Sequence, residues 1–186
     1  MRPLTPPQVA TIEQLLAEEN DFRSLALFRL AIDTMLRASD LVALTVADVT
    51  GSDGAPLDET AVRQQKTSGV VRASISPATK EALRRWLPVR PQFCGEWLFP
   101  GRVRGEHLSE CQYRRDAKRW FDMARLDTRY YSTHSLRRTK AALVFAKTGN
   151  IEIVRRLLGH ASVQATSRYL GIDDADALNV AREVKI

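Results

Sequence analysis

The chain has 186 residues, a length that suits one compact domain. Hydrophobic residues make up 44% and charged residues 27%, a composition that predicts a globular fold and excludes a disordered chain. No run reaches the roughly 18 consecutive apolar residues of a membrane span, and the first residues lack the apolar core of a signal peptide. We therefore expect a soluble, cytoplasmic protein with no membrane partner.

The net charge of +6 is unevenly distributed along the chain. Residues 1–60 carry 4 basic and 10 acidic side chains, whereas residues 84–140 carry 14 basic and 6 acidic ones. Of the 28 basic residues 22 are arginine, whose planar guanidinium matches phosphate oxygens. This pattern favours a polyanion as the partner. Cys94 and Cys111 have neither a CxxC partner nor a nearby pair of histidines, so we expect no disulfide framework and no metal site.

The first third of the chain has the pattern of three helices. Thr5 is a candidate N-cap and Gln8 completes a capping box, which predicts a helix over TPPQVATIEQLLAEEN. A second helix is predicted over 22–37, and its many apolar positions indicate that most of it is buried. Ser39 is then expected to cap a short helix that ends at Leu44.

The middle of the chain predicts a small antiparallel sheet between helices. From Val62 to Ile75, β-branched residues flank the turn TSG, the pattern of a hairpin or of two strands of a small antiparallel sheet. Ser76 and Pro77 open a helix over ATKEALRRWLPV, and WLFPG is typical of an extended piece that ends in a turn.

Short helices fill the rest of the sequence. Ser109 and Gln112 predict a capping box for a helix that runs to about Leu126. Three further helices end at glycines; their expected N-caps and ends are Thr133 or Ser132 with Gly149, Asn150 with Gly159, and Ser162 with Gly171. Residues 172–186 predict an amphipathic tail helix that covers its own core or reaches a neighbouring subunit. The expected fold is mostly α with a small antiparallel β-sheet, in a single domain over 1–186.

Six polar residues occupy positions that the packing of a helical core does not explain. They are two arginines, two histidines, a lysine at the hairpin turn and a tyrosine: Arg37, Lys66, His134, Arg137, His160 and Tyr169. A single kind of chemistry, the cleavage of a phosphodiester, would use all six side chains. Cationic side chains and a histidine donor stabilise the charge on the non-bridging oxygens, and a tyrosine oxygen is a suitable nucleophile. Fixed cations do the work of a metal ion, so we expect no cofactor.

Five of these six residues, all except Lys66, lie in segments that resemble a known family. TMLRASDLVALTVADV, THSLRRTKAALVFAKTG and IVRRLLGHASVQATSRYLGI look like the three signature boxes of the tyrosine recombinases, or phage integrase family, in the right order. The resemblance covers about residues 5–171. It implies the tyrosine recombinase catalytic-domain fold and a site-specific recombinase that cleaves and rejoins double-stranded DNA without metal or ATP.

The resemblance also implies how the phosphate is bound. Arg37 and Arg137 would clamp the scissile phosphate, and His160 would hydrogen-bond one of its oxygens. Asp40 fits the acidic supporting position that follows the first arginine.

The remaining three residues are implied in bond making and breaking. Tyr169 would be the nucleophile that forms a 3′-phosphotyrosyl link, and His134 would accept or return its proton. Lys66 would be the general acid for the 5′ oxygen, although Lys80 lies close in sequence. Conserving the phosphodiester energy in this way lets another 5′ hydroxyl reverse the step.

Further basic and aromatic residues are candidates for contacts with DNA. The helix that starts near Ser109 has a basic face that could follow the DNA backbone or a groove, or could simply be solvated. Its members are Arg114, Arg115, Lys118 and Arg119, and Arg138 beside Arg137 could add a phosphate contact. Tyr130 and Tyr131 are rival nucleophiles by residue type, and we interpret them as packing residues or DNA contacts.

Most family members carry an additional N-terminal helical DNA-binding domain, and we expect this chain to lack it, either as part of a longer protein or as a short member like the fimbrial-switch invertases. We expect a monomer in solution and a tetramer on DNA, encoded by a bacterium, phage or plasmid. Two alternatives stay open: a type IB topoisomerase-like DNA relaxing activity, and a catalytically silent DNA-binding regulator that retains the fold.

Overall fold

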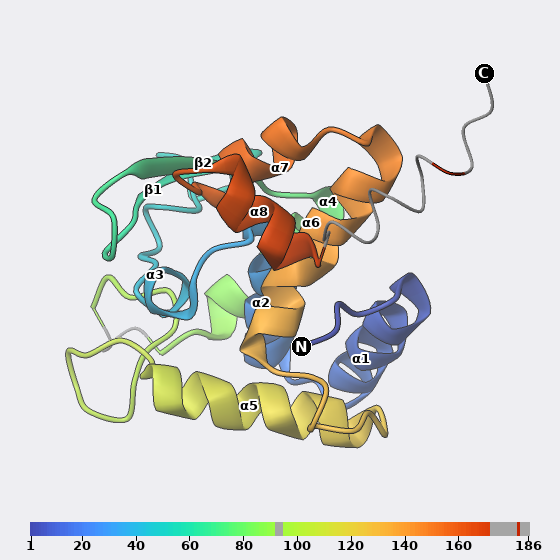
Figure 1. Ribbon diagram of the computed structural model, residues 1–186. Coiled ribbons are helices and arrows are strands. Elements are labelled where there is room, and N and C mark those ends of the chain that lie inside the picture. Colours follow the sequence, from blue (N-terminus) through green and yellow to red (C-terminus); the bar gives the residue numbers. More distant parts are fainter. Residues whose placement is uncertain (92–94, 172–181, 183–186) are drawn as a thin grey trace.

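The computed structural model describes residues 1–91, 95–171 and Arg182 (Figure 1). Helices and strands in chain order are α1 Pro6–Glu18, α2 Phe22–Thr34, α3 Ala38–Val42, β1 Glu59–Arg63, β2 Val70–Ser74, α4 Pro77–Trp86, the 3₁₀ turn η1 Leu87–Val89, α5 Glu110–Met123, α6 Thr133–Thr148, α7 Ile151–Leu158 and α8 Val163–Leu170. The expectation of a mostly helical fold with a small antiparallel sheet is confirmed. The predicted tail helix over 172–186 lies outside the described residues apart from Arg182. Within 1–91 and 95–171 no helix is both long and apolar enough to span a membrane.

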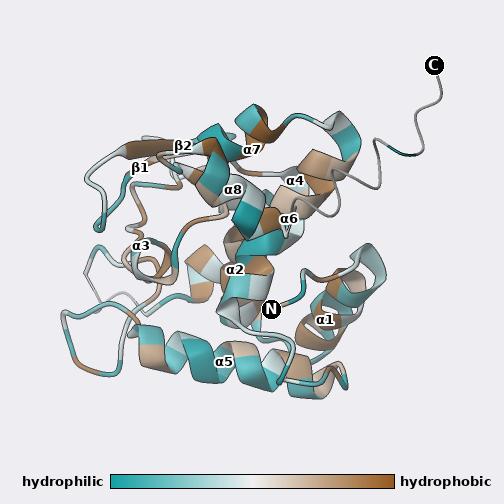
Figure 2. Ribbon diagram, viewed as in Figure 1, coloured by the Kyte–Doolittle hydropathy of each residue, from teal (hydrophilic) through white to brown (hydrophobic). Residues whose placement is uncertain are grey.

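Helix α2 occupies the centre of the molecule, with α1, α4 and α6 packed around it (Figure 1). Ten of its 13 residues are buried, as its apolar pattern predicts. Phe28 meets the edge of Trp120 from α5, with ring centroids 5.7 Å apart. Helix α5 is hydrophilic on its outer side and packs its aromatic side against this core (Figure 2). The long helices α2, α5 and α6 thus form one frame around a shared core.

The end of α2 differs from the prediction in a way that matters for the site. The helix stops at Thr34, three residues before the predicted end, because Met35 adopts a left-handed conformation with φ of 50°. Arg37 is then extended and serves as the N-cap of α3, so the expectation that Ser39 caps this helix is wrong. Arg37 makes no side-chain capping bond. The break therefore leaves its guanidinium free to point away from the core.

The predicted hairpin is confirmed and begins earlier than expected, at Glu59. Strands β1 and β2 pair antiparallel in the register Glu59↔Ser74 to Arg63↔Val70. The turn between them carries Lys66 and contains Ser68 in a left-handed conformation. One face of β2 is buried, and β2 packs against α2 and α7. The sheet thus places the turn with Lys66 beside the C-terminal helices.

Apart from the cap of α3, the predicted caps agree with the structure except at α5. Ser132 rather than Thr133 caps α6, and Asn150 and Ser162 cap α7 and α8. At α5 the Ser109 hydroxyl accepts from the Gln112 amide, but the Gln112 side chain donates to Asp116, so the capping box is half formed. The segment WLFPG forms isolated antiparallel bridges at Trp97 with Thr45 and at Pro100 with His107, and the chain bends at Leu98 and Phe99 between them, so the predicted extended piece is interrupted.

A buried carboxylate ties three helices together behind the site. Asp33 of α2 lies 2.9 Å from the Lys140 ammonium of α6 and also accepts hydrogen bonds from the Ser76 amide and the Thr79 hydroxyl at the start of α4. Burial raises the pKa of Asp33, but these hydrogen bonds and Lys140 outweigh it and hold the pKa below its usual value. Because α6 carries His134 and Arg137, this contact fixes the helix that supplies two of the six candidate site residues.

Candidate active site

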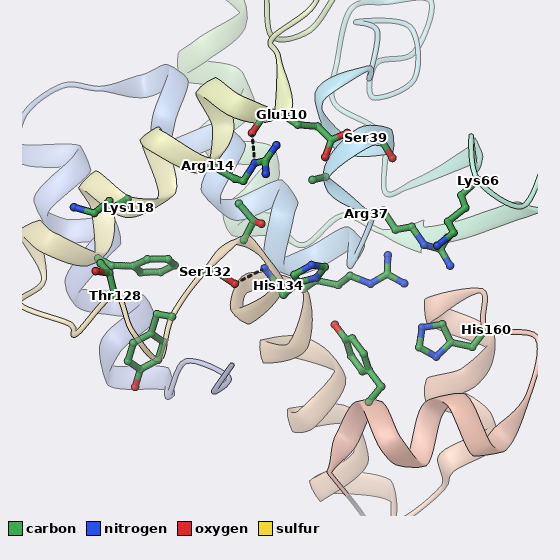
Figure 3. Close-up of a pocket in the computed structure, with 16 residues that line it drawn as sticks. Arg37, Ser39, Lys66, Glu110, Arg114, Lys118, Thr128, Ser132, His134 and His160 are labelled. Atoms are coloured by element: carbon green, nitrogen blue, oxygen red, sulfur yellow. Dashed lines mark hydrogen bonds between the residues drawn. The ribbon is translucent and has the colours of Figure 1, made fainter.

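All six residues singled out in the sequence line one cavity of about 640 Å³. The cavity lies between α5, the first turn of α6, α8 and the β1–β2 turn. Figure 3 shows Arg37, Lys66, His134 and His160 extending from different elements toward the same space. The structure thus brings these distant segments together around one cavity.

Each of the two arginines has a buried guanidinium nitrogen, and the structure shows how Arg137 is held in place. Arg137 is only 5% exposed, and its Nη2 donates to the carbonyl of Leu158 at the C-terminus of α7, 2.9 Å away. The Nη1 atoms of Arg37 and Arg137 are buried and have no hydrogen-bond partner among the described residues. Burial and the neighbouring charge of Arg37 lower the pKa of Arg137. Two unpaired guanidinium nitrogens in one cavity form a site for an anion.

Tyr169 lies on α8 beside these arginines. Its hydroxyl is buried and has no well-aligned hydrogen-bond partner in the part of the chain that the structure describes, although the Arg137 guanidinium is close enough to interact with it. Burial raises the pKa of Tyr169, and the guanidinium groups of Arg137, Arg138 and Arg37 oppose that rise. Arg138 stacks on the tyrosine ring, with Cζ 5.2 Å from the ring centroid, while its Nη1 donates to the carbonyl of Met1. Arg138 therefore contacts the back of the tyrosine and does not line the cavity.

His160 follows the C-terminus of α7 and meets Tyr169 edge to face, with ring centroids 5.3 Å apart. Its Nδ1 lies 3.1 Å from the hydroxyl of Thr166. Burial and the positive charges of Arg137 and Arg37 lower the pKa of His160 to about 4. The imidazole is therefore neutral at pH 7 in the free protein.

His134 lies in the first turn of α6 and is more exposed than His160. Partial burial, followed by the charges of Arg137, Arg138 and the N-terminal amino group, lowers its pKa. A neutral imidazole close to a phenol can accept the phenolic proton.

Lys66 is exposed at the β1–β2 turn, and Asp40 supports the backbone next to it. Asp40 is buried, and its Oδ1 accepts a hydrogen bond of 2.9 Å from the Gln65 amide. The alternative Lys80 lies elsewhere and forms an ion pair with Asp58 at 2.5 Å. Of the two lysines, the structure brings only Lys66 to the cavity.

The rival tyrosines differ in position. Tyr131 lines the cavity, but its hydroxyl accepts a hydrogen bond of 3.2 Å from Gln8 and its ring packs against Phe121. Tyr130 is 45% exposed, and its ring lies beneath the guanidinium of Arg2 at 4.5 Å. Tyr169 is the tyrosine whose hydroxyl is buried at the arginine pair.

The basic residues of α5 separate into three positions. Arg114 and Lys118, one turn apart, line the cavity, as does Glu110. Arg115 faces a second hollow of about 430 Å³ that Arg23 and Arg102 also line. Arg119 forms ion pairs with Glu19 and Asp21 in the turn between α1 and α2.

Thr166 escaped the sequence analysis. It is completely buried on α8, three residues before Tyr169, and contacts the ring of His160. The three-residue spacing, which puts both side chains on one helix face, was the available signal. Across 1–91, 95–171 and Arg182, no group of three or more histidine, cysteine or acidic side chains is arranged to hold a metal ion.

Comparisons with known proteins find sequence relatives among the tyrosine recombinases. Tyrosine recombinase XerC of Erythrobacter litoralis is 30% identical over 162 residues, which cover 87% of this chain and 50% of the relative. XerC of Neisseria meningitidis serogroup B is 32% identical over 158 residues, or 81% of this chain and 48% of the relative. The chain thus spans about half the length of these curated relatives.

Solved structures share the fold. The crystal structure of XerA recombinase matches with a TM-score of 0.79 at 20% identity, covering 98% of this chain and 65% of that one. XerH site-specific recombinase bound to difH substrate matches with a TM-score of 0.76 at 18% identity, covering 97% of this chain and 54% of that one. The family model described as phage integrase family matches residues 2–176. The chain therefore belongs to the phage integrase family.

Proposed function

We propose that residues 1–186 form the catalytic domain of a site-specific tyrosine recombinase. It cleaves and rejoins double-stranded DNA through a 3′-phosphotyrosyl intermediate and needs neither a metal ion nor ATP. One observation carries the proposal: three buried polar atoms without partners among the described residues, Nη1 of Arg37, Nη1 of Arg137 and Oη of Tyr169, belong to side chains that line one cavity. Buried polar groups are normally paired, so unpaired ones indicate a missing ligand. A phosphodiester satisfies all three.

The proposed cleavage step follows from these positions. The two arginines bind the non-bridging oxygens, and Tyr169 Oη attacks phosphorus while the bond from phosphorus to the 5′ oxygen breaks. The phenolic proton passes to His134, and Lys66 gives a proton to the leaving 5′ oxygen. His160 hydrogen-bonds a phosphate oxygen. The reverse sequence with a different 5′ hydroxyl rejoins the strand.

The arginines also make the tyrosine a better nucleophile. Burial raises the pKa of Tyr169, which disfavours the phenolate. As the proton leaves, the charges of Arg137, Arg138 and Arg37 stabilise the developing negative charge on the oxygen. Partial burial, followed by the charges of Arg137 and Arg138, lowers the pKa of His134 and so favours the neutral imidazole that can accept the proton.

Double-stranded DNA is the proposed partner, with Arg114 and Lys118 on its phosphates at the cavity and Arg115 farther along the backbone. The solved relatives support this, because XerH is described as bound to its difH substrate and lambda integrase as a dimer bound to a core site. We further propose a monomer in solution that assembles into a tetramer on DNA, in the cytoplasm of a bacterium that hosts a phage or plasmid. The intact set of six residues argues against a silent regulator.

The test is covalent capture of DNA. Wild-type protein, Tyr169→Phe and Tyr131→Phe are incubated with supercoiled plasmid in EDTA at low salt and quenched with detergent. Tyr131→Phe is the matched control because it removes another hydroxyl from the same cavity. We expect protein-linked DNA with wild type and Tyr131→Phe and none with Tyr169→Phe. An adduct that survives in Tyr169→Phe would refute the assignment of the nucleophile.

The same reactions separate the two alternative activities. A topoisomerase-like enzyme would relax the plasmid without exchanging strands between sites. A binding module would shift the DNA in a gel and form no adduct in any variant.

A further inference from the structure

The backbone of His160 is fixed by Arg155 on both sides of the residue. The His160 amide donates to the Arg155 carbonyl at 3.0 Å, and the His160 carbonyl accepts from Arg155 Nη1 at 2.8 Å. Two further bonds to Glu152 hold the Arg155 guanidinium in place. Because the backbone cannot shift freely, the orientation of the imidazole depends on the side-chain torsions and on what its two nitrogens contact.

One of these nitrogens is already occupied. Nδ1 lies 3.1 Å from the hydroxyl of Thr166, a residue that is completely buried. This contact leaves Nε2 as the ring nitrogen available to the cavity. The chemistry of His160 therefore depends on whether Nε2 carries a proton.

The surroundings of the Thr166 hydroxyl favour one tautomer of His160. A hydroxyl has a single proton to donate, and the Thr166 oxygen lies 3.2 Å from the Ser162 carbonyl, which can only accept. The oxygen of Thr166 then serves as an acceptor toward His160. A neutral imidazole next to an acceptor places its one proton on the facing nitrogen, Nδ1, and Nε2 keeps its lone pair.

We propose that Thr166 is a positioning residue that holds His160 in the Nδ1–H tautomer, so that Nε2 enters the cavity as a proton acceptor and becomes a donor only after a phosphate has arrived. The first part, the tautomer, is a property of the free protein. The second part rests on the proposed function.

The charges around the ring explain the second part. Arg37, Arg137 from α6 and Lys66 from the β1–β2 turn line the cavity that His160 faces, and the Tyr169 phenol of α8 is neutral. In the free protein burial disfavours a second proton on the imidazole, and the charges of Arg137 and Arg37 add to this effect, in line with its lowered pKa. A bound phosphate offsets their charge, so Nε2 takes up one proton from solvent and donates it in a hydrogen bond to a phosphate oxygen. DNA binding at pH 7 should therefore be coupled to proton uptake at His160.

The tautomer is measured directly by NMR on the intact chain. Protein with ¹⁵N-labelled histidine gives three sets of imidazole signals, from His107, His134 and His160. Single His→Gln variants assign each set to its residue. At pH 7 we expect His160 to have a protonated Nδ1 and an unprotonated Nε2. In Thr166→Val the signal should move toward the Nε2–H form or a mixture, and in Thr166→Ser it should stay as in wild type.

Thr139→Val is the matched control. Thr139 is also buried, donates to the carbonyl four residues earlier and accepts from a nitrogen, the Leu4 amide, but it lies away from the cavity on α6. This variant should keep the wild-type tautomer at His160. A protonated Nε2 in the wild type at pH 7, or an unchanged tautomer in Thr166→Val, would overturn the proposal.

Activity supplies a second readout. General acid–base groups contribute roughly 10²–10⁴-fold to a rate, and partial loss of their alignment should cost about tenfold. We expect Thr166→Val to form adducts about tenfold more slowly than wild type at pH 6. Above pH 7 its rate should depend less on pH than the wild-type rate, because an imidazole in the Nε2–H tautomer can donate to the phosphate oxygen without taking up a second proton. Thr166→Ser should restore both rate and profile. A uniform loss at every pH would indicate a purely structural role and overturn the second part, and absence of any adduct would refute the proposed function while leaving the NMR result intact.

Discussion

Gly159 ends α7 immediately before His160, and its replacement by alanine should destabilise the protein far more than the same change at other helix ends. Gly159 has φ of 63°, and a Cβ built there would lie 2.5 Å from Val71 Cγ2 and 3.0 Å from Gln64 Oε1. Val71 belongs to β2, and Gln64 follows β1. The glycine thus allows the β1–β2 hairpin to approach the turn that carries His160.

The magnitude has two parts. A left-handed conformation costs a residue with a Cβ about 1–2 kcal/mol. Forcing a methyl group into a packed site adds about 1–3 kcal/mol. Gly149 ends α6 with φ of 61°, and a Cβ there would meet nothing within 4 Å. Gly149→Ala should therefore show the first cost alone, and Gly159→Ala should show both.

Urea unfolding followed by circular dichroism measures the difference. With a slope of about 2 kcal/mol per molar urea, an extra cost near 2 kcal/mol lowers the midpoint by about 1 M relative to Gly149→Ala. Val71→Ala removes the clashing atom, so the double variant Gly159→Ala with Val71→Ala should recover part of the loss in a double-mutant cycle. Equal midpoints for the two glycine variants would refute the close approach of hairpin and helix end.

Two other predictions concern DNA binding and pH. Arg114 lines the cavity and its Nε donates to the Glu110 carbonyl, so Arg114→Ala should reduce the slope of log affinity against log salt concentration by about 0.9, because a lost phosphate contact releases one counterion fewer. Arg119→Ala, whose side chain is paired with Glu19 and Asp21, should leave the slope unchanged in the same filter-binding titration. His160 has its pKa lowered from 6.5 to about 4, so as pH falls through that interval the unfolded chain binds a proton that the folded chain does not, and stability declines. His160→Gln should remove this part of the acid destabilisation. In thermal unfolding, the Tm of the variant should therefore fall less between pH 7 and pH 4 than the Tm of wild type. An equal fall in Tm would show that the pKa of His160 is not lowered in the folded protein.

Much of the fold follows from local signals in the sequence. Ser132, Asn150 and Ser162 stand where a helix needs an acceptor for its first amides, and the glycines that end the same helices adopt positive φ. The hairpin follows from β-branched residues on both sides of a short turn. These signals depend on neighbouring residues alone, which is why the chain reveals them without knowledge of the tertiary structure.

The break at Met35 has no such signal. The apolar pattern of α2 continues through Leu36, and neither glycine nor proline interrupts it. Met35 adopts φ of 50° while buried in the small cluster that joins α6 and α7. Packing against residues more than 100 positions later therefore overrides the local preference. That tertiary contact directs Arg37 toward the cavity.

The sequence shows that α5 has a basic face, but for a geometric reason it does not show which of these basic residues reach the cavity. Successive residues on a helix are 100° apart, so Arg114 and Lys118 share one line while Arg115 and Arg119 share the next. Which line faces the cavity is decided by the aromatic side of α5 against the core. The partners of Arg119, Glu19 and Asp21, lie about 100 residues earlier in the chain, and no local pattern identifies them.

The cavity is lined by several positively charged side chains, and contacts behind these side chains hold them in place in the free protein. Two guanidinium groups and an ammonium in one partly buried space repel one another when no anion is present. Arg137 is held from behind by the Leu158 carbonyl, at the C-terminal end of α7 where the helix dipole is negative. The backbone beside Lys66 is held by the buried carboxylate of Asp40. Because these supports act on one nitrogen or on the backbone, the Nη1 atoms stay unpaired and the cations remain available to an incoming phosphate.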